Sequence, residues 1–198
     1  MKKMTMLLLS AILLLFFQLS MHPLHAETPS ADVESTFRQG DKVLNLGLGI
    51  GSTLYRGRYY STSIPPISGS LEIGVMDDFL VEDMTLGVGG YLGFASSRYR
   101  WSGAGTEWGW NYNYIIVGGR AAVHYPLVES LDTYTGLMLG FNIVTSSSVG
   151  TVTGSASSGG LVYSWYAGGR YYLNDSFAIM GELGYGIAYL TLGVSLKF

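Results

Sequence analysis

The feature that most constrains this chain is the alternation of side chains over residues 188–198. Every second residue there is apolar: Ala188, Leu190, Leu192, Val194, Leu196 and Phe198. Because successive side chains of a β-strand point to opposite faces, this segment predicts a strand with one apolar face. The intervening residues are small or polar, and Lys197 is the one charged residue among them. A soluble sheet normally covers its solvent face with charge, so we expect the apolar row to face lipid and the polar row to line a barrel.

The same alternation recurs along the chain. It predicts strands near residues 42–54, 67–76, 84–96, 110–125, 132–145 and 161–173, and a seventh before the last one within residues 177–198. Segments of roughly 10–13 residues suit tilted strands that cross hydrocarbon, where a closed barrel satisfies every backbone group. We therefore predict an all-β fold, an eight-stranded antiparallel up-and-down transmembrane β-barrel.

The connections between these strands alternate in length. Residues 77–83, 126–131 and 174–176 are compact, which predicts periplasmic turns, whereas 55–66, 97–108 and 145–160 are longer and predict external loops. A tight turn is expected at 184–187. Aromatic residues gather near the expected outer rim and are interpreted as a girdle at the membrane boundary: Tyr55, Tyr59, Tyr60, Tyr99, Trp101, Trp108, Trp110 and Tyr112. Tyr125, Tyr171, Phe177 and Phe198 are assigned to the inner rim.

The N-terminus predicts a cleaved signal peptide over residues 1–26. Lys2 and Lys3 precede an apolar run over residues 6–19, and Ala26 offers a small residue for cleavage. This run is shorter than the roughly 20 residues that a membrane-spanning helix needs, which disfavours an anchor. Residues 27–40 are polar without an apolar period and are predicted to form a flexible periplasmic arm. Residues 41–198 are then the barrel domain.

Composition excludes several classes of function. The chain has 11 Lys and Arg against 14 Asp and Glu, with no basic patch to recruit nucleic acid. It has no cysteine, so disulfides and thiolate metal sites are absent. A lipocalin-like soluble barrel would reverse the two faces, and the strands carry too little charge for its exterior.

Four charged residues fall at inward positions of the predicted strands: Glu72, Arg120, Arg170 and Glu182. Opposite charges can pair inside a narrow barrel, so we interpret the four as a structural network that closes the lumen. The alternatives are a polar constriction in a narrow conduction path, or a hydrolytic carboxylate pair of Glu72 and Glu182, which would need an open cleft.

No catalytic, cofactor or metal site is predicted. His124 is the single histidine after the signal peptide, and it lies at the periplasmic end of its strand. A Ser-His unit needs a serine and an orienting acid beside it, and the nearby Ser176 lies in no motif. A single histidine also disfavours zinc. We interpret His124 as a polar residue that faces a turn.

The chain resembles the OmpA/OmpX-like group of small outer-membrane barrels, and in particular the outer-membrane β-barrel proteins of Bacteroidetes. The resemblance rests on residues 40–49, which open the barrel, on 87–93 and 119–122 within the third and fourth predicted strands, and on 182–186 and 192–198 at the end of the chain. The resemblance implies a location in a Gram-negative outer membrane and no common catalytic residues. It also implies that the terminal Phe198 is recognised by the barrel assembly machinery.

These observations favour a structural or interaction scaffold that displays external loops. The expected partners are outer-membrane lipid, the barrel assembly machinery and extracellular ligands of the loops, with a monomeric protein and no cofactor. A narrow pore for small solutes or ions is the alternative, while a lipid-modifying enzyme lacks its residues. Exchange of residues 55–66 or 145–160 should then change attachment or binding.

Overall fold

The structure is a computed structural model that describes residues 35–55, 57–103, 106–150, 154 and 159–198. The expected signal peptide and residues 27–34 of the expected arm lie outside the described residues. Eight strands are present in them: β1 (Lys42–Ser52), β2 (Tyr60–Met76), β3 (Thr85–Gly103), β4 (Thr106–Val128), β5 (Leu131–Gly150), β6 (Gly160–Tyr172), β7 (Phe177–Tyr185) and β8 (Ala188–Lys197). No helix in the described part is long and apolar enough to cross a membrane.

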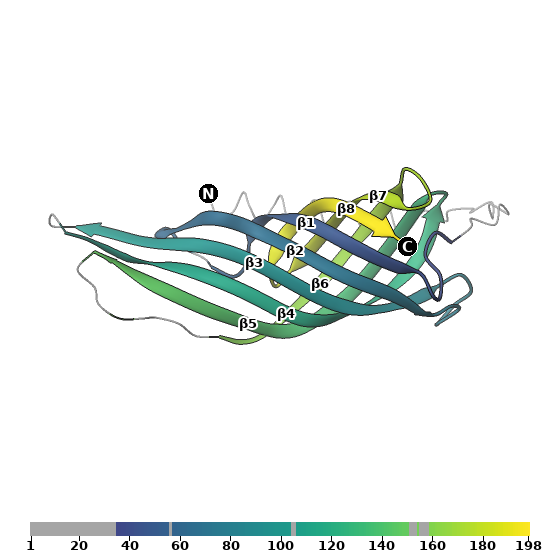
Figure 1. The fold of residues 1–198 in the computed structure, drawn as a ribbon, viewed down its shortest axis with the longest axis horizontal. Coiled ribbons are helices and arrows are strands. Elements are labelled where there is room, and N and C mark those ends of the chain that lie inside the picture. The colour runs from purple at the N-terminus through teal and green to yellow at the C-terminus, as the bar shows by residue number, and fades with distance from the viewer. Residues whose placement is uncertain (1–34, 56, 104–105, 151–153, 155–158) are drawn as a thin grey trace, which may run out of the picture. The chain divides into compact units, whose positions relative to one another are not determined.

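The strands form a closed antiparallel barrel (Figure 1). Each strand pairs with the next, and β1 pairs with β8 from Val43↔Lys197 to Ser52↔Ala188. This confirms the predicted fold class and strand number. The expected tight turn joins β7 to β8 at Gly186 and Ile187. Gly186 has φ +125°, and a Cβ there would collide with the backbone oxygen of Tyr163, so glycine is required.

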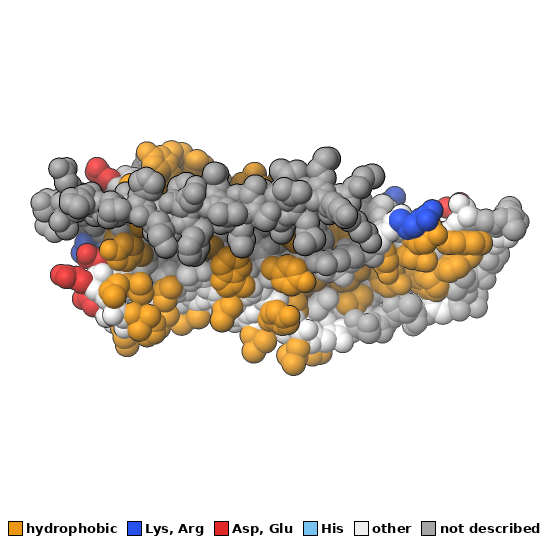
Figure 2. Space-filling model, turned by 180° about the vertical axis from the view of Figure 1, so that it is seen from behind, with side chains coloured by type: hydrophobic (Ala, Val, Ile, Leu, Met, Phe, Trp, Pro, Cys, Tyr) orange, Lys and Arg blue, Asp and Glu red, His pale blue; other side chains and the backbone are white. Residues whose placement is uncertain are grey.

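The two faces of the barrel differ as the alternation predicts. Leu137 and Leu139 are 65% and 64% exposed on the outer face, whereas Asn45, Ser70 and Ser195 are buried inside. Figure 2 shows apolar side chains over the visible outer surface, with charged side chains gathered toward the two ends. An outer surface of this kind cannot be hydrated favourably over its whole height, because it exposes large aliphatic side chains in rows.

Four neighbouring strands are much longer than the other four. Strands β2 to β5 contain 17, 19, 23 and 20 residues, whereas β1, β6, β7 and β8 contain 9 to 13. At the end of the barrel where β1 begins and β8 ends, the eight strands reach about the same level. The extra length of β2 to β5 therefore extends from the opposite end (Figure 1). We call residues 60–66, 97–103, 106–114 and 143–150 the wall.

The wall corrects the expected loop boundaries. Most of 97–108 is a β-hairpin, and parts of 55–66 and 145–160 are strand rather than loop. The prediction ended each strand where its outward apolar row ended. Tyr, Trp and Thr nevertheless have high strand propensity, and the pairing of β3 with β4 continues to Gly103↔Thr106.

The wall also corrects the interpretation of the outer aromatic residues as a membrane girdle. Tyr99 pairs with Trp110 and Trp101 pairs with Trp108, in register with the inward pair Gly89↔Arg120. Tyr60 pairs with Tyr99. Since side chains of paired residues share a face, these aromatic residues continue the inward face and do not face the surrounding membrane.

Residues 35–41, which we call the N-terminal segment, lie across the barrel end where the chain enters β1. Its backbone is hydrogen-bonded to the barrel at several points: among them, Gln39 N–H donates to Asp77 Oδ1 at 2.8 Å and Gly40 N–H donates to the Gly74 oxygen at 2.9 Å. Phe37 is 1% exposed. An apolar ring and paired backbone groups therefore place residues 35–40 of the predicted arm on the barrel. The flexibility of the arm stays a prediction.

Candidate functional site: the barrel lumen

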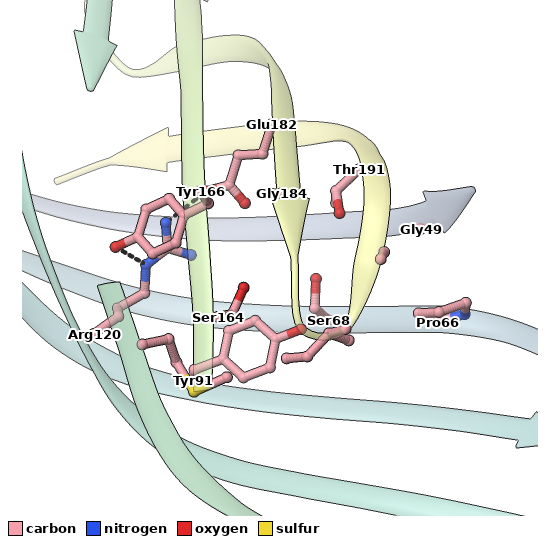
Figure 3. A pocket seen from close by; sticks show the side chains of 13 residues that line it. Gly49, Pro66, Ser68, Tyr91, Arg120, Ser164, Tyr166, Glu182, Gly184 and Thr191 are labelled. Carbon is pink, nitrogen blue, oxygen red and sulfur yellow. Dashed lines mark hydrogen bonds and ion pairs between the residues drawn. The ribbon is translucent and has the colours of Figure 1, made fainter. Parts of the chain in front are cut away.

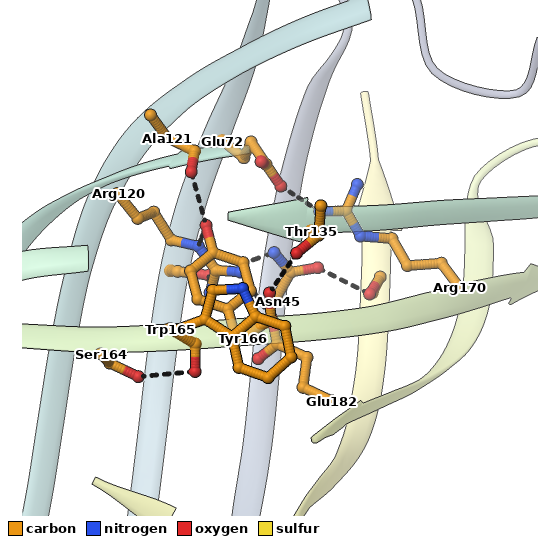
Figure 4. A network of polar contacts seen from close by, with 12 residues as sticks. Asn45, Glu72, Arg120, Ala121, Thr135, Ser164, Trp165, Tyr166, Arg170 and Glu182 are labelled. Atoms are coloured by element: carbon orange, nitrogen blue, oxygen red, sulfur yellow. Dashed lines mark hydrogen bonds and ion pairs between the residues drawn. The ribbon is translucent and has the colours of Figure 1, made fainter. Parts of the chain in front are cut away.

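A cluster of charged side chains fills the lumen near the N-terminal segment. Arg170 of β6 forms an ion pair with Glu72 of β2 (Figure 4). It forms a second ion pair with Asp132 of β5 at 3.0 Å. His124 of β4 lies against the same two acids. Glu72 and Arg170 are both 0% exposed. Gly87 of β3 makes room for them, since a Cβ there would lie 2.9 Å from Glu72 Oε1 and 3.0 Å from His124 Nε2.

His124 lies between two acids. Its Nδ1 lies 2.8 Å from Asp132 Oδ1, and its Nε2 lies 3.0 Å from Glu72 Oε1. An ionised carboxylate only accepts hydrogen bonds, so both contacts are hydrogen bonds when both ring nitrogens carry a proton. In that form two cations face two anions. This balance allows four ionised groups to lie away from water, whereas any one of them alone would be strongly unfavourable.

A second layer of polar side chains lies farther from the N-terminal segment, along the barrel axis. Arg120 of β4 pairs with Glu182 of β7 and donates to Tyr166 Oη at 3.0 Å and to Ser70 Oγ at 3.2 Å (Figure 4). The guanidinium also lies over the Tyr166 ring, 4.0 Å from its centroid. Ser70 accepts from Asn45, which in turn accepts from Ser195 at 2.7 Å. The layer therefore ties β1, β2, β4, β6, β7 and β8 together across the lumen.

Apolar side chains cover both charged layers. Phe37 lies 4.2 Å from the His124 ring at one end, measured between centroids, and Arg170 lies 5.5 Å from the Phe37 centroid. At the other end Ile187 is 5% exposed and packs with Ile116 and Tyr166. Its carbonyl accepts from Thr53 N–H at 3.0 Å, which holds the β7–β8 turn over the opening.

The space that remains between these covers is small. A cavity of about 30 Å³ lies beside Arg120 and Glu182 and is also lined by Tyr91, Ser68 and Thr191 (Figure 3). That volume holds about one or two water molecules. The described lumen can therefore stabilise charge and hold water, but it has no room for a substrate.

All four charged residues singled out in the sequence lie on the inward face, and the structure pairs them as Glu72 with Arg170 and Arg120 with Glu182. His124 is buried in the same cluster instead of facing a turn. The ring nitrogen that would face a nucleophile faces Glu72. Within the described ranges, no group of three or more His, Asp or Glu side chains could hold a metal ion.

Sequence reasoning missed Asp132 and Phe37. Asp132 is an even number of residues from the inward-facing Met138, and a short turn separates its strand from that of His124. The alternation of side chains could therefore have placed Asp132 on the inward face near His124. Phe37 carried no such signal, because it lies outside every periodic segment. Phe198 is 70% exposed beside the start of β1, and its role in assembly stays a prediction.

No protein-family model matches this chain, and no curated protein matches it significantly. Solved structures do match. OprG of Pseudomonas aeruginosa is 12% identical with a TM-score of 0.50, over 83% of this chain and 99% of that one. The N-terminal barrel domain of Pseudomonas aeruginosa OprF is 16% identical, with a TM-score of 0.49 over 81% and 98% of the two chains. Ail of Yersinia pestis is 15% identical, with a TM-score of 0.46 over 81% and 100%.

The fold is that of a small outer-membrane β-barrel. At 12% identity the likeness to OprG shows a shared fold and nothing of its role. The closed eight-stranded topology, the exposed apolar rows and this likeness agree with the OmpA/OmpX-like resemblance of the sequence. The narrower resemblance to proteins of Bacteroidetes stays a prediction.

Proposed function

We propose that this protein is a closed outer-membrane barrel that serves as a scaffold for the wall. Its location is supported by the exposed aliphatic rows on the outer face, which lipid would cover. The wall rises at the end opposite the short turns 77–84, 129–130 and 173–176, and short turns are typical of the periplasmic side. The wall is therefore assigned to the outside of the cell.

One observation carries the choice of a scaffold over a pore: the described lumen is filled at four successive levels. Phe37, the Glu72–Arg170 cluster, the Arg120–Glu182 layer and Ile187 follow one another along the axis. An eight-stranded barrel leaves an interior just wide enough for its own side chains. An ion would have to displace paired buried charges at two of these levels, which is a large barrier.

The test is the conductance of the refolded protein in planar lipid bilayers. We expect no steady conductance from protein that shows the heat-dependent shift in gel mobility of a folded barrel. A steady conductance that changes in Arg170→Gln or Glu182→Gln, each checked for the same mobility shift, would contradict the proposal and establish the narrow pore instead.

A further inference from the structure

The inward face of the wall carries a continuous row of aromatic rings. Tyr60 and Tyr99 lie 5.1 Å apart, Tyr99 and Trp110 6.0 Å, Trp110 and Trp108 5.3 Å, and Trp108 and Trp101 5.6 Å, measured between ring centroids. Tyr112 joins the row at 6.2 Å from Tyr60. We call these six residues the aromatic row. Each of them is partly exposed, so part of each side chain is open to solvent.

Among the described positions of the wall, the face that holds the aromatic row carries no charged residue; Arg58, just before the wall, lies 5.0 Å from the centroid of the Tyr59 ring. Arg98, Arg100 and Glu107 are the charged residues among the described wall positions, and all three have the opposite parity. Arg100 confirms this placement, because its guanidinium donates to Asn111 Oδ1 at 2.8 Å on the outer side. The inward face instead offers exposed hydroxyls beside the rings, including Thr62 and Ser148.

This pairing of partly exposed rings with hydroxyls and no charge defines the chemistry of a partner. The face of an aromatic ring is electron-rich and attracts the weakly positive C–H groups of an apolar surface. A pyranose with equatorial hydroxyls has such C–H faces above and below its ring and hydroxyls around its edge. An ionic partner would lose hydration on this face without gaining a counter-charge.

The position of the aromatic row favours a partner from the medium over a lipid of the same membrane. The row has the inward parity. It lies on the parts of β2, β3 and β4 that extend beyond the short strands β1, β6, β7 and β8 (Figure 1). Lipid headgroups surround the barrel and would meet the outer side of the wall, where Arg98 and Arg100 lie. From these observations we propose that the aromatic row binds an uncharged saccharide chain from outside the cell.

This inference depends on the proposed function, because it needs the wall on the outer side of the membrane. The test uses the full protein in lipid nanodiscs, with cellohexaose as the probe and tryptophan fluorescence as the signal. We expect saturable quenching or a blue shift. We also expect Trp108→Ala to weaken cellohexaose binding about tenfold, which is the effect of losing one well-stacked ring. Trp108→Phe should retain most of the affinity.

The matched control is Asn113→Ala, which changes an exposed residue of the same strand on the opposite face. It should bind cellohexaose as the unchanged protein does. No response to cellohexaose from folded protein would overturn the saccharide site. So would equal binding by Trp108→Ala, or a response to sulfated saccharide or to an uncharged aromatic peptide alone. A folded, non-conducting barrel without cellohexaose binding would leave the scaffold proposal standing, so the two failures are distinguishable.

Discussion

At the scale of single residues, the lumen shows how buried charge is made tolerable. Glu72 is within hydrogen-bond distance of both Arg170 and His124, and so is Asp132. Each acid therefore has two basic partners from different strands, and each basic side chain has two acids. The cluster matters for stability mainly through what happens when one member is lost. The remaining members would then be buried, charged and unpaired, which is strongly unfavourable.

The first prediction follows from this balance. Glu72→Gln should lower the free energy of unfolding by about 3–5 kcal/mol, since it removes one anion from a fully buried cluster and leaves its partners unpaired. Urea unfolding of the refolded protein, followed by tryptophan fluorescence, measures the loss. The double variant Glu72→Gln/Arg170→Gln should lose less than the sum of the two single variants.

A suitable control is Asp41→Asn, because Asp41 lies 3.7 Å from Lys197 and both side chains are partly exposed. A pair of this kind contributes about 0–1 kcal/mol, so the unfolding midpoint should barely move. If Glu72→Gln were as stable as Asp41→Asn, the cluster would have no structural role.

At the scale of elements, the N-terminal segment behaves as part of the barrel although it is no strand. Its anchor is Phe37, whose ring covers His124 and Arg170. Phe37→Ala should release the segment, because burial of the ring is its main apolar contact and loss of a buried Phe side chain costs about 3–5 kcal/mol. Arg38 should then become readily accessible to trypsin in folded, membrane-embedded protein.

Limited proteolysis followed by mass measurement reports this release directly as cleavage after Arg38. Gln39→Ala provides the comparison, since Gln39 contributes its backbone N–H to Asp77 and its side chain is exposed. Equal cleavage rates in the unchanged protein, Gln39→Ala and Phe37→Ala would show that the ring does not hold the segment.

At the scale of the whole molecule, the unequal strand lengths define two different ends. The chain contains no cysteine, so a single introduced thiol is a unique label site. Ser102→Cys, near the tip of the wall, should react with a membrane-impermeant maleimide on intact cells. Glu82→Cys, in the β2–β3 turn, should react after the cells are lysed. Labelling of Glu82→Cys on intact cells would invert the proposed orientation.

The sequence by itself determined the barrel, its eight strands and the sides on which Glu72, Arg120, Arg170 and Glu182 lie. The physical reason is that the side-chain period of a strand is two, so parity assigns a face without knowledge of any partner. The same two-residue period assigned the outward-facing leucines. It assigns side chains correctly in any strand that has one apolar face and one polar face.

Only the tertiary structure showed which inward side chains contact one another, because the position of a residue in a strand gives its face but not its partners. Which charges pair depends on strand register and on side-chain reach across the lumen, so the union of His124 with Glu72 and Asp132 needed three strands to close around it. Phe37 reached the lumen through a segment with no period at all. The aromatic row was misplaced because Tyr and Trp suit both a membrane boundary and a half-exposed sheet face. Pairing of β3 with β4 decided between them, since it extended the inward face beyond the end of the apolar rows.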